Sequence, residues 1–412
     1  MSTEQPHPDQ AADLNKYPWY RARFWDGMRT RTFWSLLRRH RFAVSCSRLY
    51  LPLLTIFVTP IHSLCHRWQE LRWRRRVEAA PPMQSPLFII GHWRSGTTLL
   101  HELLALDQRH TYPTNYDCFS PANFLSTRWF NTRCFKFLVP DRRPMDNVSL
   151  GWDRPQEDEF GLLNLGIPSI YETAAFPNQG PVNEAYLDFV DLPPADLDRW
   201  KAGLLWFLRR LHFRDPRRFI LKSPPHLGRV ATLLKMFPDA KFVHIVRDPF
   251  AVFASSLRLW RSLFATQAMQ VPNHCDWLED FVLDTFDRLY DAYHSQRELL
   301  KPDQIAEVRY EELVTDPIGR LRTIYENLEL SGFEELRPLV EEYVAEHSDY
   351  QPNRHHLDET TRAKVADRWD WYLREYGYPE PSQTADAEPI PAPSQQRPGP
   401  SRATVARGDG ER

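Results

Sequence analysis

Cysteine is scarce in this chain of 412 residues and follows no pattern. The five cysteines are scattered, their number is odd, and no two of them form a CxxC pair. A disulfide framework of the kind that stabilises small secreted domains is therefore not expected. Reduced thiols indicate an intracellular protein, and we expect it in the cytoplasm.

The sequence also lacks a secretion signal and a long apolar run. Its first twenty residues are polar, so no signal peptide is expected. The most apolar stretch, Leu49–Leu64, contains Pro52 and Pro60 and falls short of the roughly 20 residues that span a bilayer. Two interpretations stay open: a helix packed on a catalytic domain, or a helix lying in a membrane surface.

A strong net charge is missing as well. The formal charge of -2 gives no general attraction for nucleic acid, and no nucleic-acid partner is expected. The charge is uneven, however, because arginine is dense and acids are few between Arg21 and Arg76. This basic segment allows peripheral contact with a membrane, while the oligomeric state is not indicated.

Metal-ligating clusters are rare too. His62, Cys65 and His66 lie close enough in sequence to suggest a metal site. No second ligand cluster accompanies them, so a polar helix face is the preferred interpretation and no metal is expected.

What the sequence does contain is a series of short apolar segments followed by helical patterns. Candidate strands are Leu87–Ile90, Phe219–Leu221, Lys241–Val246 and Ile305–Arg309. Helical patterns follow the first three strands at Thr97–Leu106, Gly228–Met236 and Phe250–Leu263. This alternation predicts a P-loop-like α/β fold of three layers, with a central parallel sheet flanked by helices and an N-terminal helical extension.

Composition divides the chain into regions. We expect a mobile tail over 1–16, a basic and aromatic helical extension over 17–80, a P-loop-like domain over 86–378 and a disordered Pro-rich tail over 379–412. A linker rich in alanine and proline, residues 79–86, immediately precedes the first strand of the domain.

The most informative segment is Leu87-Phe-Ile-Ile-Gly-His-Trp-Arg-Ser-Gly-Thr-Thr-Leu-Leu-His101. It predicts a strand, a glycine-containing loop and a helix N-terminus, which together form a site for an anion. The spacing from Gly91 to Gly96 to Thr98 is that of a phosphate-binding P-loop. The lysine that an ATPase or GTPase needs is absent, because Thr97 occupies its position. The loop is therefore interpreted as a phosphate site not used for ATP hydrolysis.

A second segment runs Lys241-Phe-Val-His-Ile-Val-Arg-Asp-Pro-Phe-Ala-Val-Phe-Ala-Ser-Ser256. Arg247 ends a strand, Asp248-Pro249 opens a helix, and Ser255 follows eight positions after the arginine. An arginine so placed, with a hydroxyl two helical turns away, can bind a second phosphate. An Arg-Asp pair that merely caps the helix is the alternative.

Together, RSGTT after a first strand and IVRDP with its later serine resemble the sulfotransferases that use 3′-phosphoadenosine 5′-phosphosulfate. The chain looks closest to the bacterial and tyrosylprotein-type branches. The resemblance covers roughly 86–330 and includes Tyr310, in a YEEL segment similar to one whose tyrosine lies near the adenine. It assigns the following residues to the donor. Arg94, Ser95, Gly96, Thr97 and Thr98 would hold the phosphosulfate end, and Arg247 and Ser255 the 3′-phosphate.

Arg94 stands where the cytosolic members carry lysine. A fixed guanidinium would stabilise charge on the transferring sulfonate without a metal, although it cannot donate a proton at ordinary pH. Lys222 matches a second family lysine and is expected to contact the sulfonate.

The acceptor needs a general base, and three candidates stay open. His226 lies where cytosolic members carry a catalytic histidine, but two intervening prolines displace it. Asp117 follows the first helix, in the region where the tyrosylprotein branch places its glutamate. The third candidate is the acidic run Glu157-Asp-Glu159, with Glu157 and Glu159 as the carboxylates considered.

The expected function is thus transfer of a sulfonate to a hydroxyl, less readily an amine, of an acceptor that the sequence does not identify. A small molecule, a glycan, a lipid and a peptide all remain open. The alternatives are a P-loop kinase and a membrane-surface binding protein that works through its basic N-terminus.

Near the C-terminus a helix is expected from Thr361 to Tyr376, and Arg354 is a further candidate for closing over the nucleotide.

Overall fold

A computed structural model describes residues 21–134, 151–347 and 357–379. Its strands are β1 (Leu87–Ile90), β2 (His110–Thr111), β3 (Arg218–Lys222), β4 (Lys241–Val246) and β5 (Ile305–Arg309). They pair in parallel in the order β2-β3-β1-β4-β5. The predicted parallel sheet is confirmed, and β2 is a short edge strand that the sequence pattern did not reveal.

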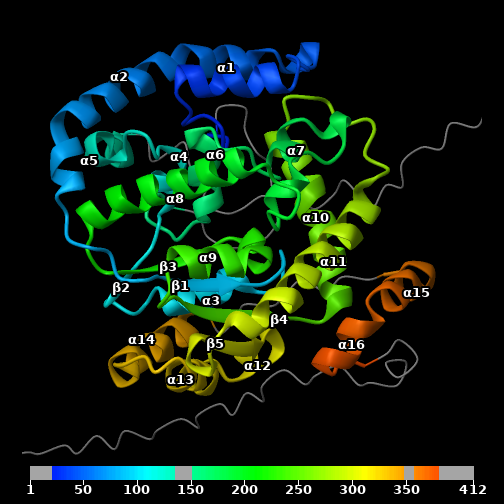
Figure 1. Cartoon of the computed structure of the whole chain (residues 1–412). Coiled ribbons are helices and arrows are strands. Elements are labelled where there is room, and N and C mark those ends of the chain that lie inside the picture. Colours follow the sequence, from blue (N-terminus) through cyan, green and yellow to red (C-terminus); the bar gives the residue numbers. More distant parts are fainter. Residues whose placement is uncertain (1–20, 135–150, 348–356, 380–412) are drawn as a thin grey trace, which may run out of the picture.

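Helices cover both faces of the sheet (Figure 1). The helices that begin before residue 180 are α1 (Thr30–Arg39), α2 (Tyr50–Glu78), α3 (Thr97–Leu104), α4 (Asn115–Phe119), α5 (Phe124–Cys134), α6 (Asp158–Leu165) and α7 (Glu172–Ala175). The later ones are α8 (Pro194–Arg214), α9 (Val230–Met236), α10 (Pro249–Gln267), α11 (Leu278–Gln296), α12 (Tyr310–Thr315), α13 (Pro317–Asn327), α14 (Phe333–Glu346), α15 (Glu359–Arg368) and α16 (Asp370–Tyr376).

Successive side chains of β1 belong to cores on opposite faces of the sheet, which shows how the layers form. Phe88 and Ile90 belong to the larger core, beneath α6, α8, α10 and α11. Leu87 and Ile89 belong to a smaller core that α3, α13 and α14 cover. Every residue of this strand is fully buried, as expected for a parallel sheet with helices on both faces. The three-layer α/β prediction is therefore confirmed.

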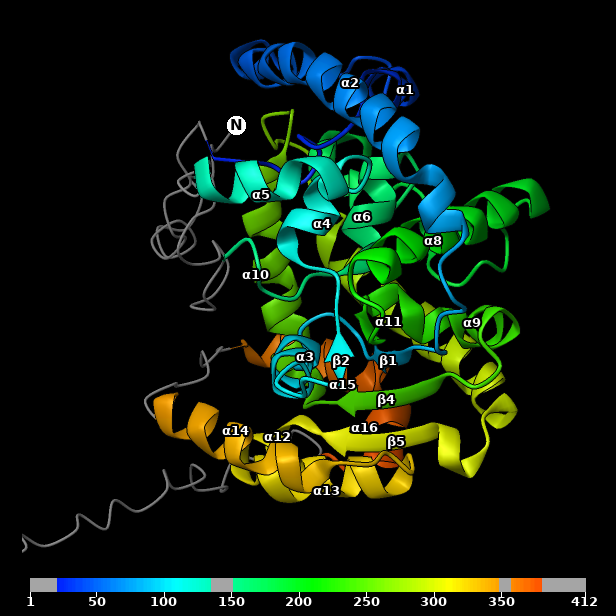
Figure 2. The same cartoon turned by 90° about the vertical axis from the view of Figure 1, so that its left-hand side faces the viewer.

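The N-terminal helices α1 and α2 form an outer layer on the larger core (Figures 1 and 2). This layer is tied to the body over long sequence distances. The Phe24 backbone N–H donates to Gln267, and the Arg48 guanidinium donates to the carbonyl oxygen of Ala268 at 2.6 Å. His40 lies against Glu172, with Nε2 2.8 Å from a carboxylate oxygen.

Helix α2 is longer than the sequence suggested. It continues through Pro60, and the stretch Cys46–Glu78 is long and apolar enough by composition to cross a membrane. Only 22% of its most apolar window is buried. The expectation of a run too short to span a bilayer is thus wrong for the helix as a whole.

The predicted C-terminal helix, Thr361–Tyr376, is instead two helices, α15 and α16, separated at Trp369. The backbone leaves helical geometry there, and the Trp369 indole is fully buried against Phe286 at 3.9 Å between ring centroids. Arg354, the candidate for closing over the nucleotide, lies outside the described residues.

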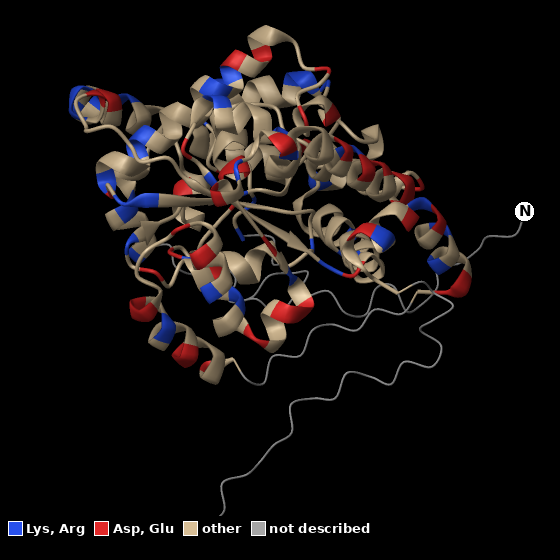
Figure 3. Ribbon diagram, turned by 60° about the horizontal axis from the view of Figure 1, so that its bottom comes forward, with Lys and Arg blue, Asp and Glu red and all other residues tan. Residues whose placement is uncertain are grey.

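Acidic and basic residues are interleaved on the face that carries α13 and α14 (Figure 3). Ion pairs such as Arg322–Glu334 and Arg337–Glu341 account for several of them. This face therefore has no continuous field of one sign.

Candidate active site

The loop between β1 and α3 is built for close approach. Gly91 has φ +155°, and a Cβ there would lie 2.7 Å from the carbonyl oxygen of Ile245 in β4. Gly96 has φ +105° and caps α3. The Ser95 hydroxyl donates to the carbonyl oxygen of His92 at 2.8 Å and closes the turn. The N–H groups of the first turn of α3 thus begin at a compact loop suited to an anion.

Arg94 lies at the centre of this loop in the left-handed region, with φ +68°. A side chain seldom adopts this conformation, so it marks a position that the surrounding structure enforces. The guanidinium Nε donates to the Ser255 hydroxyl of α10 at 2.7 Å. Two residues that the resemblance assigned to opposite ends of the donor are therefore in contact.

Arg247 follows β4 and completes the cluster. Its Nη1 donates to the carbonyl oxygen of Arg94 at 3.0 Å, and its guanidinium lies 4.1 Å from the ring centroid of Tyr310. The Tyr310 ring covers Gly96 so closely that a Cβ there would come within 2.3 Å of it. The fold thus brings together the donor residues predicted from three separate motifs.

Lys222 ends β3, next to β1 in the sheet. It pairs in register with Ile89, and its Nζ donates to Glu157 Oε1 at 2.8 Å. Both side chains are largely buried, with 2% of the lysine and 12% of the glutamate exposed. Glu157 directly precedes α6, so the pair joins a strand end to a helix start.

Tyr171 and Trp93 extend this pair toward the loop. The Tyr171 hydroxyl donates to the second oxygen of Glu157, and the Trp93 indole N–H donates to the Tyr171 hydroxyl at 2.8 Å. Burial, and then the neighbouring Glu157 carboxylate, hold the pKa of Tyr171 well above its usual value. Tyr171 therefore stays a donor and orients Glu157.

His226 is fully buried and paired with a carboxylate. Its Nε2 is 2.9 Å from Asp158 Oδ2, and neither side chain is exposed. Burial alone would raise the pKa of Asp158, but the pairing with His226 and a hydrogen bond from Ser223 hold it below its usual value. The pair joins the 3-10 helix Pro224–Arg229 to α6 inside the core.

Glu159 and Asp117 are also engaged in the interior. Arg229 donates to Glu159 at 2.7 Å, and both side chains are buried. Asp117 accepts from the Thr114 backbone N–H at 3.0 Å and is paired with Arg128 and Arg214. Of the carboxylates considered as bases, Glu157 is the one that contacts Lys222.

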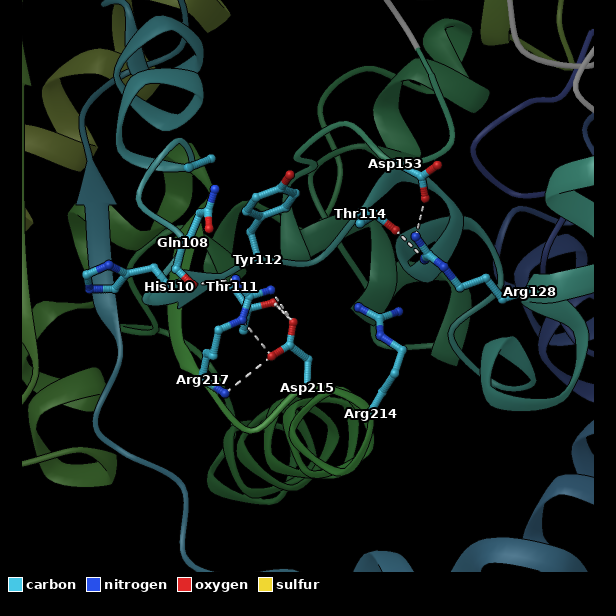
Figure 4. Close-up of a pocket in the computed structure, with 11 residues that line it drawn as sticks. Gln108, His110, Thr111, Tyr112, Thr114, Arg128, Asp153, Arg214, Asp215 and Arg217 are labelled. Carbon is cyan, nitrogen blue, oxygen red and sulfur yellow. Dashed lines mark hydrogen bonds and ion pairs between the residues drawn. The ribbon is translucent and has the colours of Figure 1, made fainter. Parts of the chain in front are cut away.

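A hollow of about 300 Å³ lies between the end of α8 and the segment after β2 (Figure 4). Two of the arginines that line it are paired with Asp117. Arg128 and Arg214 project toward it from two helices, and Arg217 donates to Asp215 at 2.8 Å. Its arginines are balanced by Asp117, Asp153 and Asp215, so it is not a free anion site. None of its lining residues belongs to the donor cluster.

His62 and His66, which the sequence suggested as metal ligands, contact polar groups of the protein. Asn123 Nδ2 lies 2.8 Å from His62 Nδ1, and His66 Nδ1 lies 2.9 Å from the carbonyl oxygen of Ala122. Within 21–134, 151–347 and 357–379, no group of three His, Cys, Asp or Glu residues is suited to hold a metal ion.

Sequence reasoning missed three residues. Trp93 lay inside a recognised motif, but no role was given to its indole. Tyr171 belongs to no motif, and its contact with Glu157 spans fourteen residues of chain. Tyr372 lies within the predicted C-terminal helix and was given no role, yet its hydroxyl lies 3.2 Å from both the backbone nitrogen and the carbonyl oxygen of Arg247.

Comparison with known proteins identifies the family of this chain. The model of the sulfotransferase family matches residues 86–335. The omega-hydroxy-beta-dihydromenaquinone-9 sulfotransferase Stf3 of Mycobacterium tuberculosis is 42% identical over 378 residues, which cover 91% of this chain and 97% of that protein. An Stf3 from Mycobacterium bovis matches to the same extent.

Solved structures agree on the fold. Sulfotransferase STF9 from Mycobacterium avium has a TM-score of 0.59 at 19% identity and covers 85% of this chain and 96% of its own. Sulfotransferase STF1 from Mycobacterium tuberculosis has a TM-score of 0.57 at 18% identity, with 82% and 91% covered. The family model spans the loop, the arginine and the tyrosine that form the cluster, and the chain belongs to the sulfotransferase family.

Proposed function

We propose that this sulfotransferase moves a sulfonate from 3′-phosphoadenosine 5′-phosphosulfate to a hydroxyl group of a lipid. The observation that carries the proposal is the 2.8 Å pair between Lys222 and Glu157, held by the strand next to the phosphate loop. It sets a cation and a carboxylate side by side where the reacting groups would meet. A P-loop kinase no longer competes, because the family is known.

We assign the residues that would bind the donor from their charge. The loop from Arg94 to Thr98 would bind the phosphosulfate, and Arg247 with Ser255 would bind the 3′-phosphate. Tyr310 already packs against Arg247, and its ring could support the adenine. Arg94 and Lys222 supply the positive charge that sulfonate transfer requires.

Glu157 is the proposed general base. It would accept the proton of the acceptor hydroxyl while the hydroxyl oxygen forms a bond to sulfur. The bond from sulfur to the 5′-phosphate oxygen breaks, and its electron pair leaves with 3′-phosphoadenosine 5′-phosphate. Lys222 would turn from the carboxylate toward the sulfonate as the donor binds, which leaves Glu157 held by Tyr171.

The acceptor class rests on the relatives. Stf3 is named for an omega-hydroxylated dihydromenaquinone, and the similarity extends over 97% of its length. We therefore propose a hydroxylated quinone or isoprenoid lipid rather than a glycan or a peptide. The reaction would take place on the cytoplasmic side of a membrane, where such a lipid resides.

The test uses the purified full chain, the donor and an omega-hydroxylated menaquinone in detergent micelles. Mass spectrometry should detect the sulfated lipid, and the same lipid without its hydroxyl should give no product. A Glu157→Gln variant should bind 3′-phosphoadenosine 5′-phosphate but form little product. Product from a hydroxylated sugar or peptide, and none from the lipid, would refute the acceptor class.

A further inference from the structure

Helix α2 has the reverse of the usual polarity. Its inner face carries polar side chains: Thr55 donates to Asp26 at 3.0 Å, and Ser63 contacts Thr30 at 3.1 Å. Its outer face carries large apolar side chains that remain exposed. They are Leu53, Leu54, Phe57, Val58, Ile61, Leu64, Trp68 and Leu71, and we call them the outer face of α2.

The exposure is large. Phe57 is 76% exposed, Leu64 is 68% exposed and Leu71 is 89% exposed. Single exposed apolar residues are ordinary, but a continuous row on one helix indicates a partner surface. The row spans about five turns of a helix whose inner side is already occupied.

The inner contacts keep α2 on the body of the protein. Gln69 is 1% exposed, donates to the carbonyl oxygen of Ala122 and accepts from the Leu125 backbone N–H. Glu70 receives both a 2.7 Å and a 2.8 Å bond from Arg210. A helix that crossed a bilayer would have to give up these partners and place its polar side chains in hydrocarbon. Helix α2 is therefore suited to lie on the surface of a membrane and not to cross it.

Charge identifies which surface it fits. The outer face is followed by the exposed arginines Arg67, Arg72, Arg74, Arg75 and Arg76, which we call the basic end of α2. The indoles of Trp68 and Trp73 lie between them, 5.1 Å apart between ring centroids. Arginine and tryptophan together favour the headgroup region of an anionic bilayer. A second copy of the chain paired in parallel would bring two basic ends together, and like charges oppose such an interface.

We propose that the outer face and the basic end of α2 dock the protein onto an anionic lipid bilayer without crossing it. The apolar residues enter the boundary between headgroups and acyl chains, and the arginines bind lipid phosphates. This inference does not depend on the proposed function, because docking requires no sulfate transfer.

Aromatic contacts connect this layer to the active site. Phe24, at the base of the layer, lies 5.6 Å from Phe160 between ring centroids. Phe160 stacks on Tyr171 at 4.4 Å, and the Tyr171 hydroxyl binds Glu157. In Figure 2 the carboxyl ends of β4 and β5 point to the side of the molecule above which α2 begins. If the acceptor is a lipid, docking brings its source close to that side.

The test measures flotation of the full chain with vesicles of phosphatidylglycerol and phosphatidylcholine, and with vesicles of phosphatidylcholine alone. The wild type should float with the anionic vesicles. Replacing Phe57, Ile61 and Leu64 by serine should weaken binding at least tenfold, because each change removes buried apolar area. The matched control replaces three exposed apolar residues on other elements, Val190, Leu299 and Val314, by serine and should bind like the wild type.

A second pair of variants tests the basic end. Replacing Arg72, Arg75 and Arg76 by glutamine should reduce the preference for anionic vesicles about fivefold for each arginine, and added salt should have the same effect. The same change at Arg322, Arg337 and Arg374, which lie on other helices, should not. Thermal melting and the shift caused by 3′-phosphoadenosine 5′-phosphate confirm that every variant is folded.

Three results would overturn the proposal. The wild type could fail to float with either vesicle, or the serine variant at the outer face could float as well as the wild type. The wild type could also form a dimer that this variant dissociates while neither binds vesicles, which would assign the face to a second copy. Absence of lipid sulfation with normal flotation would contradict the proposed function alone.

Discussion

Arg247 makes three contacts. Its guanidinium bonds the Arg94 carbonyl oxygen and lies on the Tyr310 ring, and its backbone bonds the Tyr372 hydroxyl. These contacts fix a guanidinium at the end of a buried strand, where it can receive a phosphate bidentately. We expect Arg247→Ala to weaken binding of 3′-phosphoadenosine 5′-phosphate about 10- to 100-fold, since a charged hydrogen bond contributes about 1.5–3 kcal/mol.

The matched ligand is adenosine 5′-phosphate, which lacks the 3′-phosphate. Calorimetry should show nearly equal affinity of the wild type and the variant for it. Equal losses for both ligands would mean that Arg247 supports the loop and not the 3′-phosphate.

Glu157 and Asp117 are expected to differ in role, the first acting in catalysis and the second in stability. Glu157→Gln should lower kcat by about 10²–10⁴ while the KM for the donor changes little, because only the base is removed. Asp117→Asn should instead lower the melting temperature, since it weakens a buried carboxylate held between two arginines.

Both variants are measured by initial rates and by thermal melting. Loss of stability in the Glu157 variant with unchanged activity per folded molecule would contradict this assignment. So would loss of kcat in a stable Asp117 variant.

The sequence could nominate the residues proposed for the donor, which the fold brings together, because their positions depend on local spacing around glycines and strand ends. The proposed base could not be singled out in this way, since the contact that distinguishes Glu157 is with Lys222, 65 residues away. No local signal separates three adjacent carboxylates that face Lys222, His226 and Arg229 respectively.

The sequence patterns locate the ends of the strands more closely than the end of helix α10. Three predicted strands have the observed bounds, because buried parallel strands read as short apolar runs. β3 extends one residue further at each end than predicted, and β2 is too short to give a pattern. α10 runs on to Gln267, four residues beyond the predicted end, and is capped by Asp248 as the sequence indicated.

The attachment of α2 gives a prediction about pH. Burial lowers the pKa of His62 to about 4, and its Nδ1 faces the Asn123 amide as an acceptor must. The unfolded chain binds this proton near pH 6.5, so the free energy of unfolding should fall as pH drops from about 6.5 to about 4, by up to about 3 kcal/mol for this group.

Urea unfolding at pH 7 and pH 4.5 checks this. His62→Gln keeps an acceptor for Asn123 and should show a smaller loss of stability at pH 4.5. His274→Gln, at an exposed site, serves as the control and should lose as much as the wild type. An equally large loss in the His62 variant would assign the acid sensitivity to other groups, such as the buried His92.

At the scale of the molecule, the C-terminal helices contact the proposed donor site. Trp369 is fully buried, and Tyr372 bonds the backbone of Arg247. A chain that ends after Pro379 should retain its melting temperature and its nucleotide binding, in keeping with our proposal that 86–378 is the catalytic domain. A chain that ends after Asp358 should lose both.

Tyr372→Phe separates the two effects. It keeps the buried ring and removes only the hydroxyl, so affinity for 3′-phosphoadenosine 5′-phosphate should fall a few-fold with little change in melting temperature. Full affinity in this variant, or in the shorter truncation, would show that the C-terminal helices act only in packing.

The contact between Arg94 and Ser255 has a calorimetric consequence. The Arg94 guanidinium bonds the Ser255 hydroxyl, and the Arg247 guanidinium bonds the Arg94 carbonyl oxygen. Donor binding at these residues would therefore exchange internal bonds for bonds to phosphate. The measured enthalpy should be small for so many charged contacts, and Ser255→Ala, which removes the Arg94–Ser255 bond in advance, should make it more exothermic even where the affinity declines.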